Sequence, residues 1–240
     1  MMDLKDKIVL VCGGAGGIGL GIAKALAAEG CRVAVADYSE EALKKVSKDG
    51  GLLCHACDVT DRRQVSELFV WLAAEVGPID ILVNSAGINV GNRMLANIDP
   101  VDFDRVMEIN TTGTFNCIHA ALPVMRKKRS GLIVNIVSLA GLRVMLLAWL
   151  PYCVSKFATG ALGTFVNLEE AANGIKVTNI YPGETNTPIV DKRPSPPPAE
   201  KRAAMLQPED IAACVVAVAK LPPRAVVPEL VITPPHMMVG

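Results

Sequence analysis

The chain has 240 residues, of which 51% are hydrophobic and 20% are charged. This apolar content excludes a disordered chain, and 24 basic against 24 acidic residues exclude the basic surface that nucleic-acid-binding proteins need. No uncharged stretch reaches the ~18 apolar residues of a membrane-spanning helix, and the charged first residues resemble neither a secretory nor a transit signal. We therefore expect a cytoplasmic protein without membrane or nucleic-acid partners.

The predicted elements alternate between strand and helix along the chain. Short apolar runs predict buried strands, and helical periodicity with capping residues predicts the helices. In chain order we expect strand 7–12, helix 18–29, strand 32–36, helix 39–47, strand 52–58, a helix capped at 60–61 and ending near 77, strand 79–84, a long helix from 99 or 100 to 128, strand 132–137, helix 151–172, strand 176–181, helix 208–220 and strand 226–232.

Strands separated by helices form parallel sheets with right-handed crossovers. We therefore expect an α/β fold in a single domain over residues 1–240: a doubly wound, Rossmann-like parallel sheet of about seven strands with helices on both faces. Twelve of the sixteen prolines lie at or beyond Pro182, so the alternation should loosen there, and residues 194–198 are predicted to form an irregular, partly extended loop.

The seven cysteines are an odd set without the spacing of a disulfide framework, which indicates buried thiols in a reducing compartment. Cys54 and Cys57 form a Cys-x-x-Cys pair, which in other contexts is redox-active or half of a metal site. No second pair follows, and the pair sits on or just after a strand, where nothing lowers a thiol pKa. We expect no metal site.

A glycine-rich loop follows the first predicted strand and opens the first helix: Gly13, Gly14, Ala15, Gly16, Gly17, Ile18 and Gly19. Glycines in this context allow a tight turn, a close approach of the backbone to a pyrophosphate, and amide groups that face its oxygens. The loop therefore predicts a dinucleotide site.

Asp37 ends the second predicted strand, 18 residues beyond Gly19. A carboxylate here can accept hydrogen bonds from an adenosine ribose and would repel a 2′-phosphate, and Tyr38 brings no compensating positive charge. NAD is therefore predicted in preference to NADP. Asp37 could also simply cap the next helix, and both roles are compatible.

Tyr152 and Lys156 lie four residues apart at the start of a long predicted helix, so both side chains share one face. An ammonium beside a phenol stabilises the phenolate, so we expect the pKa of Tyr152 to fall from ~10 towards the range of a working general acid/base.

Together these residues resemble the short-chain dehydrogenase/reductase family. The glycine loop, Asp37, Asp58-Val59, Asn84-Ser85-Ala86-Gly87, Asn110, Ser138, Tyr152-x-x-x-Lys156 and Pro182-Gly183 occur in the family's order. The resemblance covers about residues 5 to 190 and, more loosely, the last helix and strand.

The resemblance implies a role for each matching residue. Tyr152 would exchange the proton at the substrate oxygen, Ser138 would hydrogen-bond that oxygen, and Lys156 would lower the pKa of Tyr152 and hold the nicotinamide ribose. Asn110 would help to hold a water that relays protons from Lys156. Cofactor contacts would come from Gly13, Gly17, Ile18, Gly19, Asp37, Asp58, Val59, Asn84, Ala86, Gly87, Tyr152, Lys156, Pro182, Gly183, Thr185 and Thr187.

We therefore expect an NAD-dependent enzyme that interconverts a small-molecule secondary alcohol and a ketone, working as a homodimer or homotetramer. A 3-oxoacyl-thioester reductase of the same fold is an alternative that Asp37 disfavours, because those enzymes usually favour NADP. A non-catalytic NAD-binding regulator is a second alternative, disfavoured by the complete set Ser138, Tyr152 and Lys156.

The substrate pocket should be walled by the segments after Ser138, after Asn89 and over residues 184–206. Residues 142–150 are strongly apolar in a predicted loop, which indicates either a ligand wall or a subunit contact. The first reading predicts a hydrophobic or bulky substrate.

Overall fold

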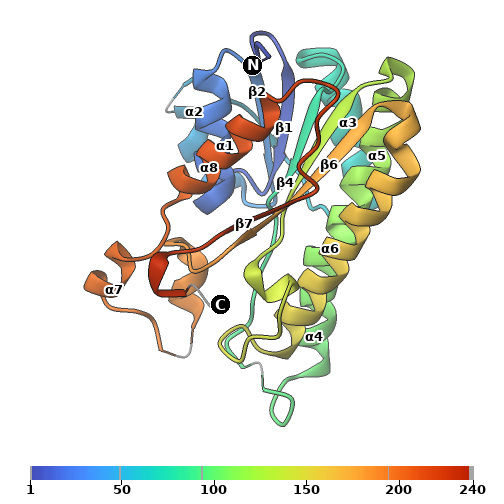
Figure 1. Ribbon diagram of the computed structural model, residues 1–240. Helices are drawn as coiled ribbons and strands as arrows, with labels where there is room; N and C mark the ends of the chain where they lie inside the picture. Colours follow the sequence, from blue (N-terminus) through green and yellow to red (C-terminus); the bar gives the residue numbers. More distant parts are fainter. Residues whose placement is uncertain (1, 49, 93, 194, 238–240) are drawn as a thin grey trace.

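One parallel sheet runs through the molecule (Figure 1). The computed structural model describes residues 2–48, 50–92, 94–193 and 195–237, and within them seven strands pair in the order β3-β2-β1-β4-β5-β6-β7. The strands are β1 (Ile8–Cys12), β2 (Arg32–Asp37), β3 (Leu53–Ala56), β4 (Ile81–Asn84), β5 (Gly131–Ile136), β6 (Ile175–Pro182) and β7 (Glu229–Ile232). All of these pairings are parallel, which confirms the predicted doubly wound fold.

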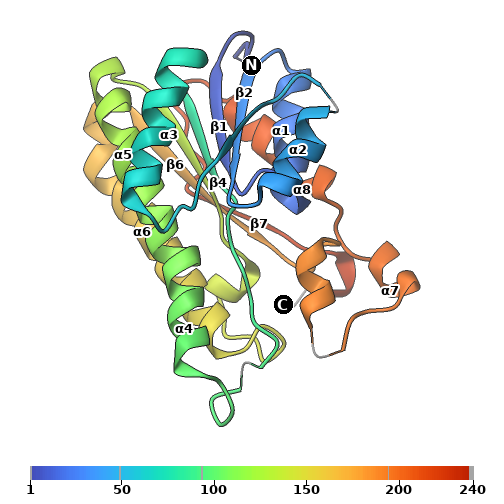
Figure 2. The ribbon, with the colours of Figure 1, turned by 180° about the vertical axis from the view of Figure 1, so that it is seen from behind.

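Helices cover both faces of the sheet, as the front and back views show (Figures 1 and 2). One layer contains α1 (Gly17–Ala28), α2 (Glu40–Lys48) and α8 (Pro208–Ala219); the other contains α3 (Arg62–Glu75), α5 (Gly113–Lys128) and α6 (Leu150–Glu170). β1 shows why both layers form, because its side chains alternate: Val9 and Val11 enter the core under α1 and α8, whereas Ile8 and Leu10 enter the core under α3 and α5.

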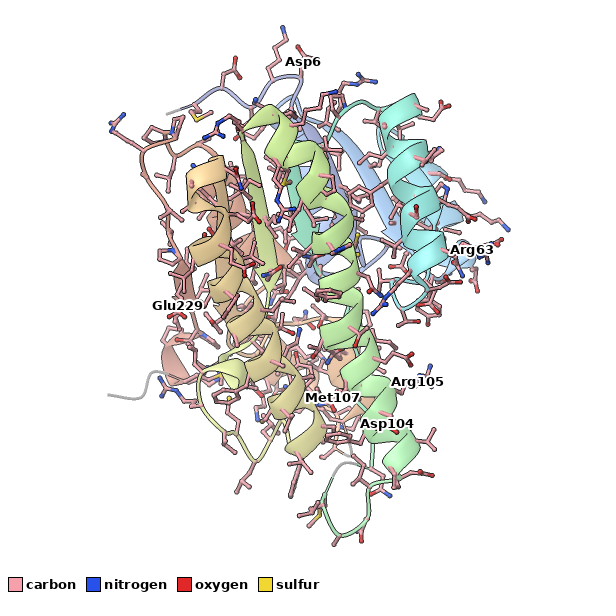
Figure 3. All side chains as sticks on the ribbon, turned by 90° about the vertical axis from the view of Figure 1, so that its right-hand side faces the viewer. Asp6, Arg63, Asp104, Arg105, Met107 and Glu229 are labelled. Carbon is pink, nitrogen blue, oxygen red and sulfur yellow. The ribbon has the colours of Figure 1, made fainter. Side chains whose placement is uncertain are left out.

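The long helix expected from residue 99 or 100 to 128 is interrupted. It consists of α4 (Pro100–Met107), a π-helical turn over Glu108–Thr112, and α5, which continue one another beside α6 (Figure 3). In the turn, the Asn110 carbonyl oxygen accepts hydrogen bonds from the hydroxyls of Thr114 and Thr159. Such a turn redirects one side chain from the regular helical pattern, and here that side chain is Asn110.

β1 and β4 begin one and two residues later than predicted, and β3 and β7 are each three residues shorter than predicted. β3 is an edge strand that pairs only with β2 and ends at Ala56. β7 begins at Glu229 and not at 226, because Pro228 has no N–H to donate; its carbonyl oxygen accepts from Asn179 instead.

The segment before α8 has more structure than predicted. A 3₁₀ turn spans Pro188–Lys192 and a short helix, α7, spans Ala199–Ala203. Of the loop expected at 194–198, Pro194 lies outside the described residues, and 195–198 contain neither helix nor strand.

Two further expectations concern the membrane and the thiols. Within the described ranges, no helix is both long and apolar enough to cross a membrane. The cysteines are the buried thiols that the sequence indicated only in part: all seven are described and all are free, and five of them are buried. Burial raises the pKa of Cys57 to about 12 and also raises the pKa of Cys54. Both members of the Cys-x-x-Cys pair therefore stay protonated at neutral pH.

Candidate active site

A cavity of about 900 Å³ lies at the carboxyl edge of the sheet. The strand order reverses between β1 and β4, and in doubly wound folds this position is where loops leave a crevice for ligands. The predicted site residues on its wall are Gly13, Gly17, Ile18, Asp37, Asp58, Val59, Ala86, Gly87, Ser138, Tyr152, Lys156, Pro182, Gly183, Thr185 and Thr187. Three other predicted residues, Gly19, Asn84 and Asn110, are not part of that wall.

The glycine loop is shaped by contacts that exclude side chains. Gly13 has φ +75°, and a Cβ there would lie 2.4 Å from the Ala86 backbone nitrogen. A Cβ on Gly19 would lie 2.2 Å from the Gly13 carbonyl oxygen. Gly19 therefore does not line the cavity itself. Its missing side chain allows the first turn of α1 to pack directly against the loop.

Asp37 holds the end of β2 against the glycine loop. One carboxylate oxygen accepts from the Ala15 backbone N–H (3.2 Å), and the other accepts from the Ser39 N–H at the start of α2 (3.1 Å). Tyr38, which is 76% exposed, lies beside it on the cavity wall. The neighbouring glycine loop, residues 13–19, contains no basic side chain. Both predicted roles of Asp37 are thus compatible with its position.

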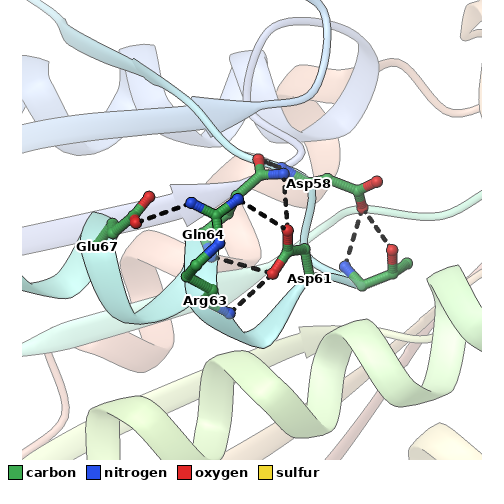
Figure 4. Close-up of polar contacts among 6 residues, drawn as sticks. Asp58, Asp61, Arg63, Gln64 and Glu67 are labelled. Atoms are coloured by element: carbon green, nitrogen blue, oxygen red, sulfur yellow. Dashed lines mark hydrogen bonds and ion pairs between the residues drawn. The ribbon is translucent and has the colours of Figure 1, made fainter.

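Asp58 lies on the wall just after β3, where it is ordered by its neighbours (Figure 4). One of its carboxylate oxygens accepts from both the N–H and the hydroxyl of Thr60, at 2.9 and 2.8 Å. Its own N–H donates to the side-chain oxygen of Gln64, and Asp61 caps α3 beside it. The second Asp58 oxygen has no such partner among the described residues.

Asn84 is buried beneath the cavity in a row of asparagines on neighbouring strands. Its amide donates to the Asn135 oxygen (2.9 Å), and the Asn135 amide donates to the Asn179 oxygen (3.0 Å). The Asn179 amide then donates to the Gly160 carbonyl oxygen of α6 (2.9 Å). This asparagine ladder ties β4, β5 and β6 to the helix that carries Tyr152.

Ser138, Tyr152 and Lys156 converge on the cavity from β5 and α6. Ser138 and Tyr152 both line the cavity, and hydrogen bonding by the Ser138 side chain lowers the pKa of the Tyr152 phenol. Lys156 Nζ donates to the Ile136 carbonyl oxygen (2.9 Å) and lies 5.5 Å from the centre of the Tyr152 ring. The three groups that the sequence pattern singled out are thus brought together.

The expected fall in the pKa of Tyr152 is wrong for this structure. Desolvation raises the pKa of the phenol to about 12, although Ser138 and Arg193 act in the opposite direction. Desolvation also lowers the pKa of Lys156 to about 8. The lysine is held by a β5 carbonyl and is itself poorly solvated, so it does not stabilise the phenolate as the spacing alone suggested.

Asn110 stands behind Lys156, and its side chain bonds to the loop after β4 and to α6. Its side chain accepts from the Ile88 N–H (2.8 Å) and donates to the Ile88 carbonyl oxygen (3.0 Å) and to the Ser155 hydroxyl (2.9 Å). Gly87 separates it from the lysine: a Cβ there would lie 3.3 Å from Asn110 Oδ1 and 3.4 Å from Lys156 Nζ. The π-helical turn thus brings Asn110 to the loop after β4.

Sequence reasoning missed a charged pair in the wall. Arg193 Nη1 lies 2.8 Å from Glu184 Oε1, and the two side chains are only 16% and 8% exposed. Met237 also lines the cavity, and its sulfur accepts from the Glu184 N–H. The one available signal was the position of Glu184, directly after Pro182-Gly183 in the segment expected to wall the pocket.

The apolar stretch 142–150 divides between the cavity and the outer surface. Met145, Leu147 and Ala148 line the cavity, whereas Val144 and Leu146 are 79% and 77% exposed. The Asn89 amide donates to the Ala148 carbonyl oxygen (3.2 Å), which ties the two expected wall segments together.

Comparison with known proteins assigns the family. The model of the short chain dehydrogenase family matches residues 7–197. The chain belongs to the short-chain dehydrogenase family. The chain is also 32% identical to an uncharacterized oxidoreductase of Staphylococcus saprophyticus, over 240 residues that cover 98% of this chain and 100% of the relative.

Solved structures of a dehydrogenase and a reductase superpose closely on this chain. The closed form of a serine dehydrogenase complexed with NADP⁺ has a TM-score of 0.90 at 27% identity and covers 97% of this chain and 96% of its own. A levodione reductase has a TM-score of 0.86 at 27% identity and covers 97% and 98%. This short-chain dehydrogenase is therefore an NAD(P)-dependent oxidoreductase of the kind that acts on CH–OH groups.

The cavity suits such a dinucleotide. The loop over residues 13–19 leaves no room for side chains at Gly13 and Gly19. Gly13, Gly16 and Gly17 line that end of the site with backbone, beside Ile18. Backbone amides at the start of α1 face it, and Asp37 follows at the end of β2. These residues fit a pyrophosphate with an adjoining ribose.

Proposed function

We propose that this short-chain dehydrogenase interconverts a secondary alcohol and a ketone with NAD(H). The observation that carries the proposal is the convergence of Ser138, Tyr152 and Lys156 on the same cavity as the glycine loop and Asp37. When bound, the nicotinamide supplies a hydride to the ketone carbon or accepts one from the alcohol carbon.

The protein contributes orientation and a proton. Ser138 hydrogen-bonds the substrate oxygen and so fixes it beside Tyr152. In reduction the Tyr152 phenol, protonated at neutral pH because of its raised pKa, donates its proton to that oxygen; in oxidation the proton returns. Lys156 holds the nicotinamide ribose, and Asn110, behind Gly87, holds the water that restores the proton.

Asp37 selects NAD over NADP in this proposal. Its carboxylate is fixed by the Ala15 and Ser39 N–H groups, so it cannot turn away from a 2′-phosphate without losing both bonds. The related serine dehydrogenase is complexed with NADP⁺, so the two cofactors must be compared directly.

The substrate is proposed to be hydrophobic or bulky. Met145, Leu147 and Ala148 present apolar surface to the cavity near the end of α6 that carries Tyr152. Burying such surface against the substrate stabilises the complex in proportion to the apolar area covered.

The test is a turnover screen over secondary alcohols and ketones, with NAD(H) and NADP(H) side by side. We expect the native enzyme to prefer NAD over NADP. Asp37→Asn should lower this preference about tenfold, because it removes the charge that repels a 2′-phosphate. Tyr152→Phe should bind NADH but should not turn over substrate. Undiminished turnover in Tyr152→Phe would refute the mechanism. An NADP preference in the native enzyme would refute the role of Asp37.

We also propose that the enzyme acts in the cytoplasm as a homodimer or homotetramer. Phe115 on α5 and Phe157, Phe165 and Leu168 on α6 are exposed, at 40% to 75%. Exposed apolar side chains on neighbouring helices are typical of subunit contacts. Light scattering on the purified protein tests this, and a monomer at micromolar concentration would contradict it.

A further inference from the structure

Arg193 is a largely buried cation of the cavity wall, and no step of the proposed reaction uses it. Lys156 donates to the Ile136 carbonyl oxygen at the catalytic centre, and Arg105 is exposed on α4. The Arg193 side chain, by contrast, is only 16% exposed and faces the cavity that contains Tyr152. A largely buried guanidinium is costly unless its N–H groups have partners.

Its partners within the protein are few. Glu184 Oε1 receives one hydrogen bond from Nη1, at 2.8 Å. Among the residues that the structure describes, no other acceptor meets this guanidinium, although it carries five N–H donors in a fixed fork. Glu184 thus anchors and orients Arg193, and most of the donors are left for a molecule in the cavity.

The pair is supported from the C-terminal side. His236 Nε2 lies 3.5 Å from the second Glu184 oxygen, and the Glu184 N–H donates to Met237. Glu184 is therefore held on three sides by Arg193, His236 and Met237. A guanidinium held in this way is pre-organised for an oxyanion, because little side-chain freedom is lost on binding.

We propose that Arg193 binds a carboxylate of the substrate, so that the substrates are hydroxy acids and the corresponding oxo acids. The acid group would sit at Arg193, and the rest of the chain would run along Met145, Leu147 and Ala148 with its secondary hydroxyl at Tyr152. The inference rests on the proposed function, because it identifies the substrate class of that same site. Arg193 would act on substrate affinity, and proton exchange would stay with Tyr152.

The position of Arg193 near the reacting group has a second consequence. Its charge acts to lower the pKa of the Tyr152 phenol, although desolvation still raises that pKa overall. A carboxylate bound at Arg193 would offset this charge, so the arginine would serve as a neutralised binding group in the loaded enzyme.

The test uses matched acids and neutral esters. A series of 3-hydroxy acids from butyrate to decanoate is compared with the methyl esters of the same chains, in the native enzyme and in Arg193→Gln. We expect the native enzyme to prefer acids, and Arg193→Gln to lower kcat/KM for acids about 10- to 100-fold while esters change less than about threefold. The KM for NAD should not change.

Two further variants keep the test interpretable. Arg193→Gln leaves Glu184 without its partner, so the double variant Arg193→Gln/Glu184→Gln removes the pair as a neutral unit and should show the same loss for acids. Arg202→Gln is the matched control, because Arg202 pairs with Asp191 in the same segment but does not line the cavity. This variant should keep the native ratio of kcat/KM for acids to kcat/KM for esters.

Several outcomes would overturn the proposal. The proposal fails if the native enzyme turns over esters as well as acids, or if Arg193→Gln lowers kcat/KM equally for both. It also fails if Arg193→Gln weakens only the binding of NAD, or if the preference for acids is lost in Arg105→Gln and not in Arg193→Gln. If no alcohol or ketone is turned over, the proposed function fails. The role of Arg193 in carboxylate binding can then still be tested by measuring binding directly. Hexanoate should bind the enzyme–NADH complex in calorimetry at least about tenfold more tightly than methyl hexanoate, and Arg193→Gln should abolish the difference.

Discussion

Lys156 Nζ donates a 2.9 Å hydrogen bond to the Ile136 carbonyl oxygen while it lies 5.5 Å from the centre of the Tyr152 ring. The ammonium is thus bound to the sheet and sits beside the phenol. Burial lowers its pKa to about 8, because one carbonyl does not replace the water that it loses. Burying the charged form of Lys156 therefore costs folding free energy, although the proposed reaction needs this residue at the catalytic centre.

Lys156→Met should stabilise the cofactor-free protein at neutral pH. Between the folded pKa of about 8 and the unfolded value near 10.5, the unfolded chain binds more protons, so native stability rises with pH in that window. The substitution should raise the free energy of unfolding by about 3 kcal/mol at pH 7 and by only about 1 kcal/mol at pH 10. Urea denaturation at both pH values measures the difference.

The control is Lys45→Met on the exposed face of α2, where Lys45 pairs with Glu41. It should change stability by less than about 0.5 kcal/mol at either pH. A destabilised Lys156→Met protein at pH 7, or an effect that does not change with pH, would contradict the burial argument.

Tyr152 should remain protonated in the cofactor-free enzyme well into the alkaline range. Its pKa is raised to about 12 because the buried phenol is poorly solvated. The difference in phenolate absorbance between the native protein and Tyr152→Phe should therefore stay near zero at pH 10. A phenolate signal from Tyr152 at pH 8 would show that Lys156 or Arg193 outweighs desolvation.

Gly13→Ala should destabilise the fold. Alanine at φ +75° is strained, and its Cβ would lie 2.4 Å from the Ala86 nitrogen, so the loops after β1 and β4 would have to separate. We expect a loss of about 2 to 4 kcal/mol. Gly16→Ala is the matched control in the same loop, because no atom lies within 4 Å of a Cβ there; thermal unfolding without cofactor should find it close to native. Equal losses in the two variants would contradict the steric explanation.

Asn135→Ala should break the asparagine ladder at its centre. It removes both the bond from Asn84 and the bond to Asn179, so the buried Asn84 amide nitrogen loses its acceptor and the Asn179 oxygen loses its donor, while the Asn179 amide still donates to Gly160. The expected cost is about 2 to 5 kcal/mol. Asn92→Ala, which removes one exposed hydrogen bond to the Asn97 carbonyl oxygen, should cost less than about 1 kcal/mol. Chemical denaturation compares them, and similar values would show that the ladder carries no special stability.

The order of strands and helices and much of the candidate site could be predicted from the sequence, because both depend on neighbours along the chain. A buried strand reads as an apolar run, as in Ile8–Cys12, and a glycine loop between strand and helix is visible as a string of glycines. Tyr152 and Lys156 share a face because the helix has 3.6 residues per turn. None of these inferences needs a distant contact.

Only the tertiary structure decided what happens where distant segments meet. The π-helical turn depends on Thr159 reaching across from α6 to Asn110. The pKa values of Tyr152 and Lys156 depend on how much water the assembled cavity excludes, which no spacing encodes. Arg193 faces the cavity because Glu184, His236 and Met237 come together there from two parts of the chain. The apolar excess noted in the composition is likewise divided by the fold: most of it fills the two cores beside the sheet, and within residues 142–150 the backbone turns some side chains to the cavity and others to solvent.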